Sequence, residues 1–135
     1  MYWLKIGCLF SAAALLLGCM ATASRGAQDY VGPLELNKNP PSYDHKRVVV
    51  KGWLDYGFEK RFLFQSASPE QSNDVNDPSC TSIEVPETLR ATATKLNHQY
   101  VLIQGLFLSD LAGERVFLGL CNKTGVQVES IKSAS

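Results

Sequence analysis

The fold is decided by the stretch RVVVKGWLDYGFEKRFLFQ, residues 47–65. Its first part, from Arg47 to Leu54, is rich in β-branched and aromatic residues, which predicts a β-strand. The tripeptide 55–57 contains Asp and Gly and favours a tight turn. A second strand is expected from Phe58 to Gln65, so that the two strands form a β-hairpin.

Further elements are expected along the chain. Strands are predicted at Thr81–Val85, Tyr100–Leu108 and Arg115–Leu120, and the segment 125–131 either extends the last of these or adds a sixth. A single helix is predicted over 86–97, because proline suits a first helical turn and apolar residues recur there at helical spacing. The polar segment 66–79 is expected to be a long loop, and the proline-containing segment 39–46 an irregular lead-in.

Two similar sequence patterns within the chain support this assignment of strands. The pattern VVVKG at 48–52 matches VLIQG at 101–105 in kind, with three apolar residues, one polar residue and a glycine. Glycine inside a strand marks a sharp bend or a close approach of two backbones. Two long strands that bend at equivalent points are typical of a small closed barrel, in which the strands must coil.

The order of three strands, one helix and two strands resembles that of the OB-fold, a five-stranded Greek-key barrel with a helix between strands three and four. The resemblance implies a mainly β domain over residues 38–131. It also implies that ligands bind at the face of strands two and three and at two flanking loops, one between strands one and two and the other between strands four and five.

Two motifs extend the resemblance. The strings NPPSYDHKRVVVKGWL (39–54) and LNHQYVLIQGLF (96–107) resemble a group of small exported proteobacterial proteins of unknown function, which share NPxxYDGKRVxVxG and LNGxYVxVxGxF. His45 and His98 stand where that group usually has glycine. Both are expected in turns, where histidine tolerates a positive φ better than most residues do.

The first residues differ from everything after them. Lys5 precedes an apolar run, 6–17, that is too short to cross a hydrocarbon core of about 30 Å as a helix, which indicates a secretory signal. The segment LLGC at 16–19 resembles the lipobox of bacterial lipoproteins, and the resemblance implies a signal peptide at 1–18 and a lipidated Cys19. Cleavage after Ala23 is the alternative, and an uncleaved anchor a third.

Lipidation sets the expected location. Residue 20 is Met, not the Asp that resembles an inner-membrane retention signal in enteric bacteria, and this favours the periplasmic side of the outer membrane. The segment 19–37 is predicted to be a flexible tether between the lipid and the domain.

Four cysteines are present. With Cys8 in the leader and Cys19 taken by lipid, Cys80 and Cys121 remain as a pair in an oxidising compartment, and we predict a disulfide between them. The alternative is two separate buried thiols. No metal site is expected, because two cysteines without a nearby histidine do not form a zinc ligand set.

The sequence offers little for catalysis. It contains no phosphate-binding glycine loop or nucleophile elbow, and nothing places a base beside a nucleophile, so neither an enzyme nor a cofactor is expected. The two histidines are interpreted as solvated turn residues, and the oxygen-rich stretch 73–77 as a polar loop, not a calcium site. A net charge of zero argues against nucleic acid as a partner.

The aromatic hairpin is the candidate partner-binding site. Its predicted members are Trp53, Tyr56, Phe58, Arg61, Phe62 and Phe64. Both faces of the second strand carry apolar residues, so one face is core and the other is a candidate exposed patch for a partner. The alternative is that most of these side chains fill or cover the barrel.

We therefore expect a non-enzymatic envelope lipoprotein that acts as a binding module for a periplasmic protein, peptide or glycan. An inhibitor or immunity protein is one concrete form of this function. The alternative is a structural or assembly component of an envelope complex. The identity of the partner and the oligomeric state stay open.

Overall fold

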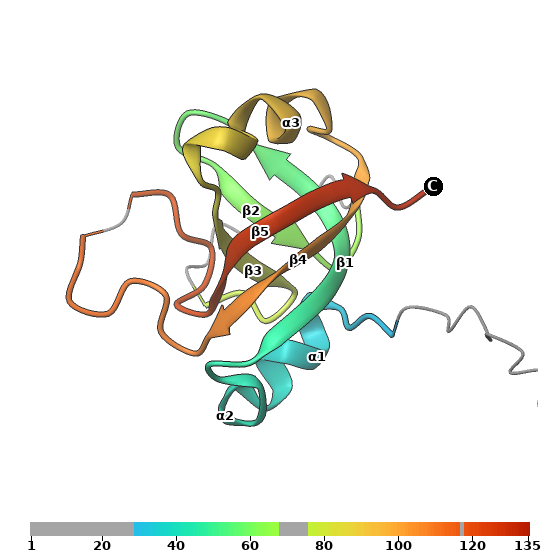
Figure 1. Cartoon of the computed structure of the whole chain (residues 1–135). Helices are drawn as coiled ribbons and strands as arrows, with labels where there is room; N and C mark the ends of the chain where they lie inside the picture. Colours follow the sequence, from blue (N-terminus) through green and yellow to red (C-terminus); the bar gives the residue numbers. More distant parts are fainter. Residues whose placement is uncertain (1–28, 68–75, 117) are drawn as a thin grey trace, which may run out of the picture.

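The computed structural model describes residues 29–67, 76–116 and 118–135 (Figure 1). The leader, Cys19, residues 19–28 of the predicted tether and residues 68–75 of the predicted loop lie outside the described residues. None of the helices in the described ranges is long and apolar enough to cross a membrane.

Five strands form a closed barrel in the order β1-β2-β3-β5-β4 (Figure 1). Their bounds are Arg47–Tyr56 (β1), Arg61–Phe64 (β2), Cys80–Glu84 (β3), Tyr100–Leu108 (β4) and Gly125–Ser133 (β5). Neighbours pair antiparallel, except that β3 and β5 are parallel. This strand order is that of a Greek-key OB-fold barrel. The predicted fold class is confirmed.

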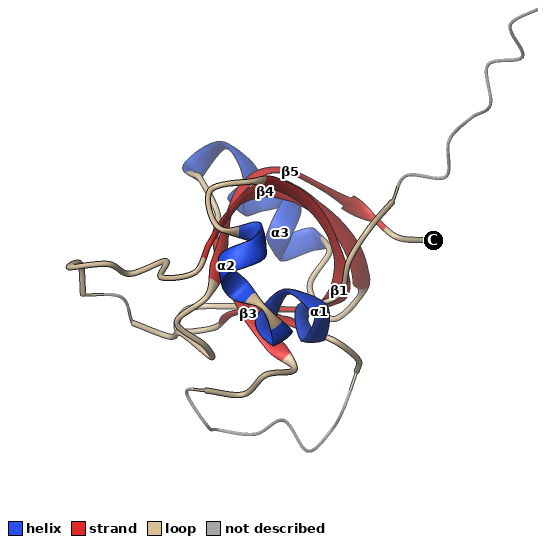
Figure 2. Ribbon diagram, turned by 90° about the horizontal axis from the view of Figure 1, so that it is seen from below, coloured by secondary structure: helices blue, strands red, loops and turns tan. Residues whose placement is uncertain are grey.

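The core fills the inside of the barrel and both of its ends. Alternate residues of the strands point inward, among them Val50, Leu54, Leu63, Ile103 and Phe107, and all of these are fully buried. Helix α3 (Arg90–Lys95) covers one end of the barrel, and the helices that precede β1 cover the other (Figures 1 and 2).

The two segments with similar patterns, 48–52 and 101–105, pair with each other as neighbouring strands. Val48 lies opposite Gly105, and Gly52 lies opposite Val101. A Cβ atom at Gly52 would lie 2.7 Å from Cγ of Leu63, and one at Gly105 would overlap the carbonyl oxygen of Gln127. The close approach predicted at both glycines is confirmed, because neither position has room for a side chain.

The turn of the hairpin lies at residues 57–60, so the predicted turn at 55–57 is wrong. β1 continues through Tyr56, whose backbone N–H donates to Oδ1 of Asn97 at 2.8 Å. β2 therefore begins three residues later than predicted, at Arg61. Residues 55 and 56 belong to the strand because they pair with Phe62 and Arg61 of β2, in addition to this hydrogen bond from a segment far away in the sequence.

The strand predicted at Arg115–Leu120 is also wrong. Its described residues, 115–116 and 118–120, form no strand, and the fifth strand is β5, in the segment for which the sequence left two alternatives open. The side chains of Val116 and Leu118 are exposed, and Cys121 is bonded to Cys80 on β3. The chain therefore leaves the sheet after β4 and returns to it only beyond Cys121.

The helix predicted over 86–97 is shorter than expected. A 3₁₀ turn at Glu87–Leu89 leads into α3, which ends at Lys95. Ala93 is the fully buried residue of α3, and Leu89 and Leu96 pack partly against the core. The predicted apolar stripe therefore faces the barrel, although fewer residues than predicted are helical.

Two short helices precede β1, namely α1 (Pro33–Lys38) and α2 (Pro40–Tyr43). Both begin at proline, whose missing N–H has no helical partner to lose in the first turn. The prolines that predicted an irregular lead-in therefore start a helix.

Part of the predicted tether belongs to the domain. Leu36 of α1 is fully buried in the barrel core, and Val31 forms a parallel bridge with Val50. Residues 33–37 are thus packed against the barrel, not flexible, because Leu36 closes its end. The domain begins before residue 38.

Both histidines occupy left-handed turns, as predicted, with φ of 57° at His45 and 58° at His98. The turn at His45 is tied to the end of β4, because the neighbouring Asp44 accepts a hydrogen bond from the backbone N–H of Ser109 at 2.7 Å. This hydrogen bond, with a smaller contribution from His45, lowers the pKa of the Asp44 carboxyl.

The placement of α1 predicts unequal effects of two identical substitutions. Leu36→Ala should lower the free energy of unfolding by about 2–5 kcal/mol, because it empties a fully buried site. Leu34→Ala, in the same helix but 47% exposed, should change it by less than about 0.5 kcal/mol. Urea denaturation of the full chain measures both. Equal, small effects would mean that α1 is not part of the core.

Candidate functional site

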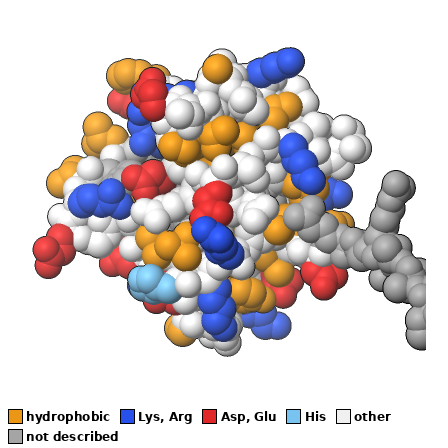
Figure 3. Space-filling view, viewed as in Figure 1, with side chains coloured by type: hydrophobic (Ala, Val, Ile, Leu, Met, Phe, Trp, Pro, Cys, Tyr) orange, Lys and Arg blue, Asp and Glu red, His pale blue; other side chains and the backbone are white. Residues whose placement is uncertain are grey.

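Two loops at one side of the barrel carry exposed apolar side chains. We call residues 57–60, between β1 and β2, loop L12, and residues 109–124, between β4 and β5, loop L45. Phe58 of L12 is 96% exposed, and Val116 and Leu118 of L45 are 93% and 73% exposed. Figure 3 shows hydrophobic side chains standing out on the side of the molecule where Figure 1 draws L45.

The two loops touch each other. Gly119 has a φ of +73°, and a Cβ atom there would overlap the carbonyl oxygen of Glu59. Between the loops lies a depression of about 450 Å³, lined by Phe58, Glu59, Arg61, Val116 and Leu118. We call these five residues the loop patch. Phe58 and Arg61 were predicted as binding residues, and both are members of it.

The C-terminal end of L45 is linked to β3 by a disulfide. Cys80 and Cys121 form the predicted disulfide, with their Cα atoms 6.0 Å apart. Beside it, the hydroxyl of Ser82 donates to the carbonyl of Asn122 at 2.8 Å and accepts from the N–H of Cys121 at 3.2 Å. These bonds hold L45 over the outer face of β2 and β3, which is the face where the OB resemblance placed a ligand. That face is largely covered by the chain itself.

Three of the predicted binding residues lie mainly in packed positions. Phe64 is 4% exposed and packs with the disulfide, and the ring of Phe62 meets it edge-on at 5.8 Å. Tyr56 is half-buried against the main core. The alternative interpretation, that these side chains cover the barrel, therefore describes Phe64 fully and the other two in part.

Trp53 lies apart from the loop patch. In the sheet, Trp53 lies opposite Phe64 of the neighbouring strand β2 and opposite Tyr100 of the other neighbouring strand, β4. Its ring meets the ring of Tyr100 edge-on at 5.2 Å. The predicted site is thus divided between two surfaces, because Trp53 and Phe58 sit on different parts of the outer surface.

Val116 and Leu118 were missed as site residues because their segment was predicted to be a strand. Its apolar content suggested burial, but Gly113 precedes it, Gly119 lies within it, and both glycines adopt positive φ. Such glycines are typical of loops and were the signal available in the sequence.

The described residues contain no group of three or more His, Cys, Asp or Glu side chains that could hold a metal ion. The two histidine side chains are 75% and 67% exposed and lie at separate turns, one before β1 and one before β4. The arrangement of the loop patch suits contact with another molecule, because it combines apolar projections with one carboxylate and one guanidinium.

Comparisons with known proteins find similar chains among solved structures. No protein-family model matches the sequence, and no curated protein sequence matches it. Among solved structures, OBody AM2EP06 bound to hen egg-white lysozyme is similar at 15% identity and a TM-score of 0.49, over 78% of this chain and 92% of the OBody.

Two aminoacyl-tRNA synthetases are similar over a small part of their length. The asparaginyl-tRNA synthetase from Pyrococcus horikoshii has 20% identity and a TM-score of 0.48, over 80% of this chain and 23% of the synthetase. A putative aspartyl-tRNA synthetase from Leishmania major Friedlin has 7% identity and a TM-score of 0.49, over 86% and 22%. The strand order of the barrel establishes the OB-fold without these likenesses.

The contact between the loops predicts a difference between two glycines. Gly119→Ala should destabilise the domain by at least about 1 kcal/mol more than Gly113→Ala, because overpacking against a backbone adds to the cost of a positive φ. Gly113 also has a positive φ, but a Cβ there meets nothing within 4 Å. Urea denaturation gives the two free energies, and limited proteolysis within L45 reports its release. Equal costs would show that the loops do not depend on their contact.

Proposed function

We propose that this chain is a non-enzymatic binding module of the bacterial envelope that captures a protein partner through the loop patch. The observation that carries the proposal is the exposure of Phe58, Val116 and Leu118, each more than 70% exposed, on two loops that contact each other. Solvent-exposed apolar side chains that gather at one place mark interaction sites.

The loop patch has the composition of a protein interface. Such interfaces bury aromatic and aliphatic anchors at the centre and place polar groups at the rim. Phe58 is the aromatic anchor, and Glu59 and Arg61 supply the polar rim. Valine and leucine side chains offer no hydrogen bond to a sugar hydroxyl, which favours a protein over a glycan at this surface.

The loop that carries most of the patch is attached to the rest of the fold at two places. The disulfide and the hydrogen bonds of Ser82 hold one end of L45, and Gly119 rests on L12. A surface that is ordered before binding loses less conformational entropy when the partner arrives. An inhibitor or immunity protein, which presents a fixed surface to a toxin or enzyme, is one form of this function.

The envelope location rests on the leader pattern, on the lipobox resemblance at Cys19 and on the likeness to small exported proteobacterial proteins. The ten peptide steps from Cys19 to Asp29 span at most about 35 Å when extended. A lipidated chain would therefore hold the barrel close to the membrane surface, on the periplasmic side of the outer membrane.

The binding role predicts that charge in the loop patch abolishes capture. In the full chain, Phe58→Asp with Leu118→Asp should weaken partner binding at least about thirtyfold, since loss of one interface anchor alone costs about 2 kcal/mol or more. The melting temperature should stay within a few degrees, because both side chains are exposed. Site-specific photocrosslinking from position 58 in envelope extracts, followed by titration of the captured protein, measures the effect.

Leu34→Asp is the matched control, because Leu34 is also an exposed leucine but lies on α1. It should bind like the unmodified chain. The proposal is wrong if the control loses binding equally, or if position 58 crosslinks to no protein while position 34 does.

Lipidation makes a separate prediction. Cys19→Ser should leave the chain unacylated and move it from the membrane fraction to the soluble periplasm, and mass spectrometry with cell fractionation measures both changes. The binding affinity of the loop patch for its partner should be unaffected. Membrane association that persists without the acyl chain would contradict the lipoprotein assignment, and a soluble form with full function in the cell would argue against a structural or assembly role.

A further inference from the structure

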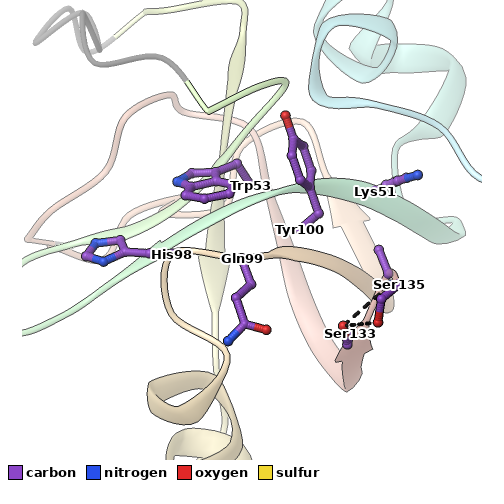
Figure 4. Close-up of a pocket in the computed structure, with 8 residues that line it drawn as sticks. Lys51, Trp53, His98, Gln99, Tyr100, Ser133 and Ser135 are labelled. Carbon is purple, nitrogen blue, oxygen red and sulfur yellow. Dashed lines mark hydrogen bonds between the residues drawn. The ribbon is translucent and has the colours of Figure 1, made fainter.

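A second depression lies where β1 and β4 meet the end of β5 (Figure 4). Its volume is about 520 Å³, within the range of about 300–1,000 Å³ that is usual for small-ligand sites. The residues that matter for its chemistry are Lys51, Trp53, His98, Gln99, Tyr100 and Ser133. We call this depression the aromatic groove. It shares no residue with the loop patch.

The two aromatic rings of the groove are held in place. The planes of the two rings are inclined at 76° to each other, so the rings border the groove as two nearly perpendicular surfaces. Behind Trp53 lies the small cluster of Phe64 and the disulfide, which fixes one side of the indole. The hydroxyl of Tyr100 accepts a hydrogen bond from the backbone N–H of Ala67 at 3.2 Å. A ligand therefore meets rings that are already ordered, which lowers the entropic cost of binding.

Polar groups at the rim of the groove can form further hydrogen bonds with a ligand. Within the described ranges, no residue accepts a hydrogen bond from the indole N–H of Trp53, and no carboxylate forms an ion pair with Lys51, whose ammonium lies 5.2 Å from the ring centre of Tyr30. The side-chain amide of Gln99 makes one long hydrogen bond, 3.4 Å, to the carbonyl of Lys95. Figure 4 shows the imidazole of His98 and the hydroxyl of Ser133 at opposite ends of the groove. Nε2 of His98 lies 3.6 Å from Oδ1 of Asp55, and the Ser133 hydroxyl pairs with that of Ser135 at 2.8 Å, so each keeps only part of its capacity for a ligand.

We propose that the aromatic groove binds a pyranose ring of an oligosaccharide. A pyranose presents a flat face of C–H groups, which packs on an aromatic ring, and an edge of hydroxyls that both donate and accept hydrogen bonds. The groove matches both parts, with Trp53 and Tyr100 for the face and the ammonium, amide and imidazole groups for the edge. This inference goes beyond the proposed capture of a protein and does not depend on it.

Other occupants fit the groove less well. An apolar peptide side chain would cover the rim groups without pairing them, and a buried unpaired polar group costs about 1–3 kcal/mol. A membrane surface is met by side chains that project from loop tips, as Phe58 does, whereas Trp53 and Tyr100 lie along strands, Trp53 half-buried and Tyr100 only 40% exposed. Sugars satisfy the rings and the rim together.

Tryptophan fluorescence gives a direct test. The sequence has two tryptophans, Trp3 in the predicted signal peptide and Trp53, so the processed chain, or the full chain with Trp3→Phe, reports from the groove alone. It is titrated with chitotriose, cellotriose and maltotriose. We expect a saturable change in the emission of Trp53 with at least one of these sugars.

Variants of the groove place the binding. Gln99→Ala and Tyr100→Ala should each weaken sugar binding at least tenfold, whereas Tyr100→Phe, which keeps the ring, should bind nearly as well as the unmodified chain. Phe58→Ala, in the loop patch, is the control and should leave the affinity for sugar unchanged. Isothermal titration calorimetry repeats the comparison without relying on fluorescence.

Three results would overturn the proposal. The first is the absence of a saturable response to any of the three sugars. The second is a response that survives both Gln99→Ala and Tyr100→Ala, which would place the sugar elsewhere. The third is a response to vesicles of phosphatidylethanolamine and phosphatidylglycerol with none to sugar, which would assign the groove to a membrane surface.

Discussion

The curvature of β1 is the constraint on which the rest of the barrel depends. Its first part pairs with β4 and its last part with β2, and Trp53 belongs to both pairings. The strand can turn from one neighbour to the other because Gly52 places no side chain against Leu63 inside the barrel. The same turn puts Trp53 beside Tyr100 on the outer surface and carries the hairpin out to L12. Both candidate binding surfaces therefore follow from one bend in one strand.

The disulfide influences which apolar side chains are buried and which are exposed to solvent. It joins residues 41 positions apart, a loop closure worth about 3–4 kcal/mol in the chain-entropy model. That is a large share of the roughly 5–15 kcal/mol that stabilises a typical domain. By drawing Cys121 onto β3, it buries Phe64 beneath L45 and leaves Val116 and Leu118 exposed. The loop that covers the usual OB ligand face thus also carries the exposed apolar side chains of the loop patch.

The barrel therefore carries two candidate binding surfaces that differ in their chemistry. The loop patch is apolar with a narrow polar rim and suits a protein, whereas the aromatic groove combines rings with hydrogen-bonding groups and suits a sugar. Because the cluster around Phe64 and the disulfide lies beside Trp53, the groove is backed by the same bond that holds L45. A net charge of zero fits partners of both kinds better than it fits nucleic acid.

What the sequence determined by itself was part of the backbone: the first four strands with the bounds of β4, the two glycines that had to lie against another strand, the left-handed histidines and the pair of cysteines. These follow from local propensity, from period-two alternation and from residue types that permit few conformations. What only the tertiary structure decided was exposure. Both faces of β2 carry phenylalanine or leucine, so no local pattern could say that Leu63 is core and Phe64 is covered by L45. Leu36 is buried and Leu118 is exposed for the same reason: burial depends on contacts between residues far apart in the chain, and a short window of sequence does not contain them.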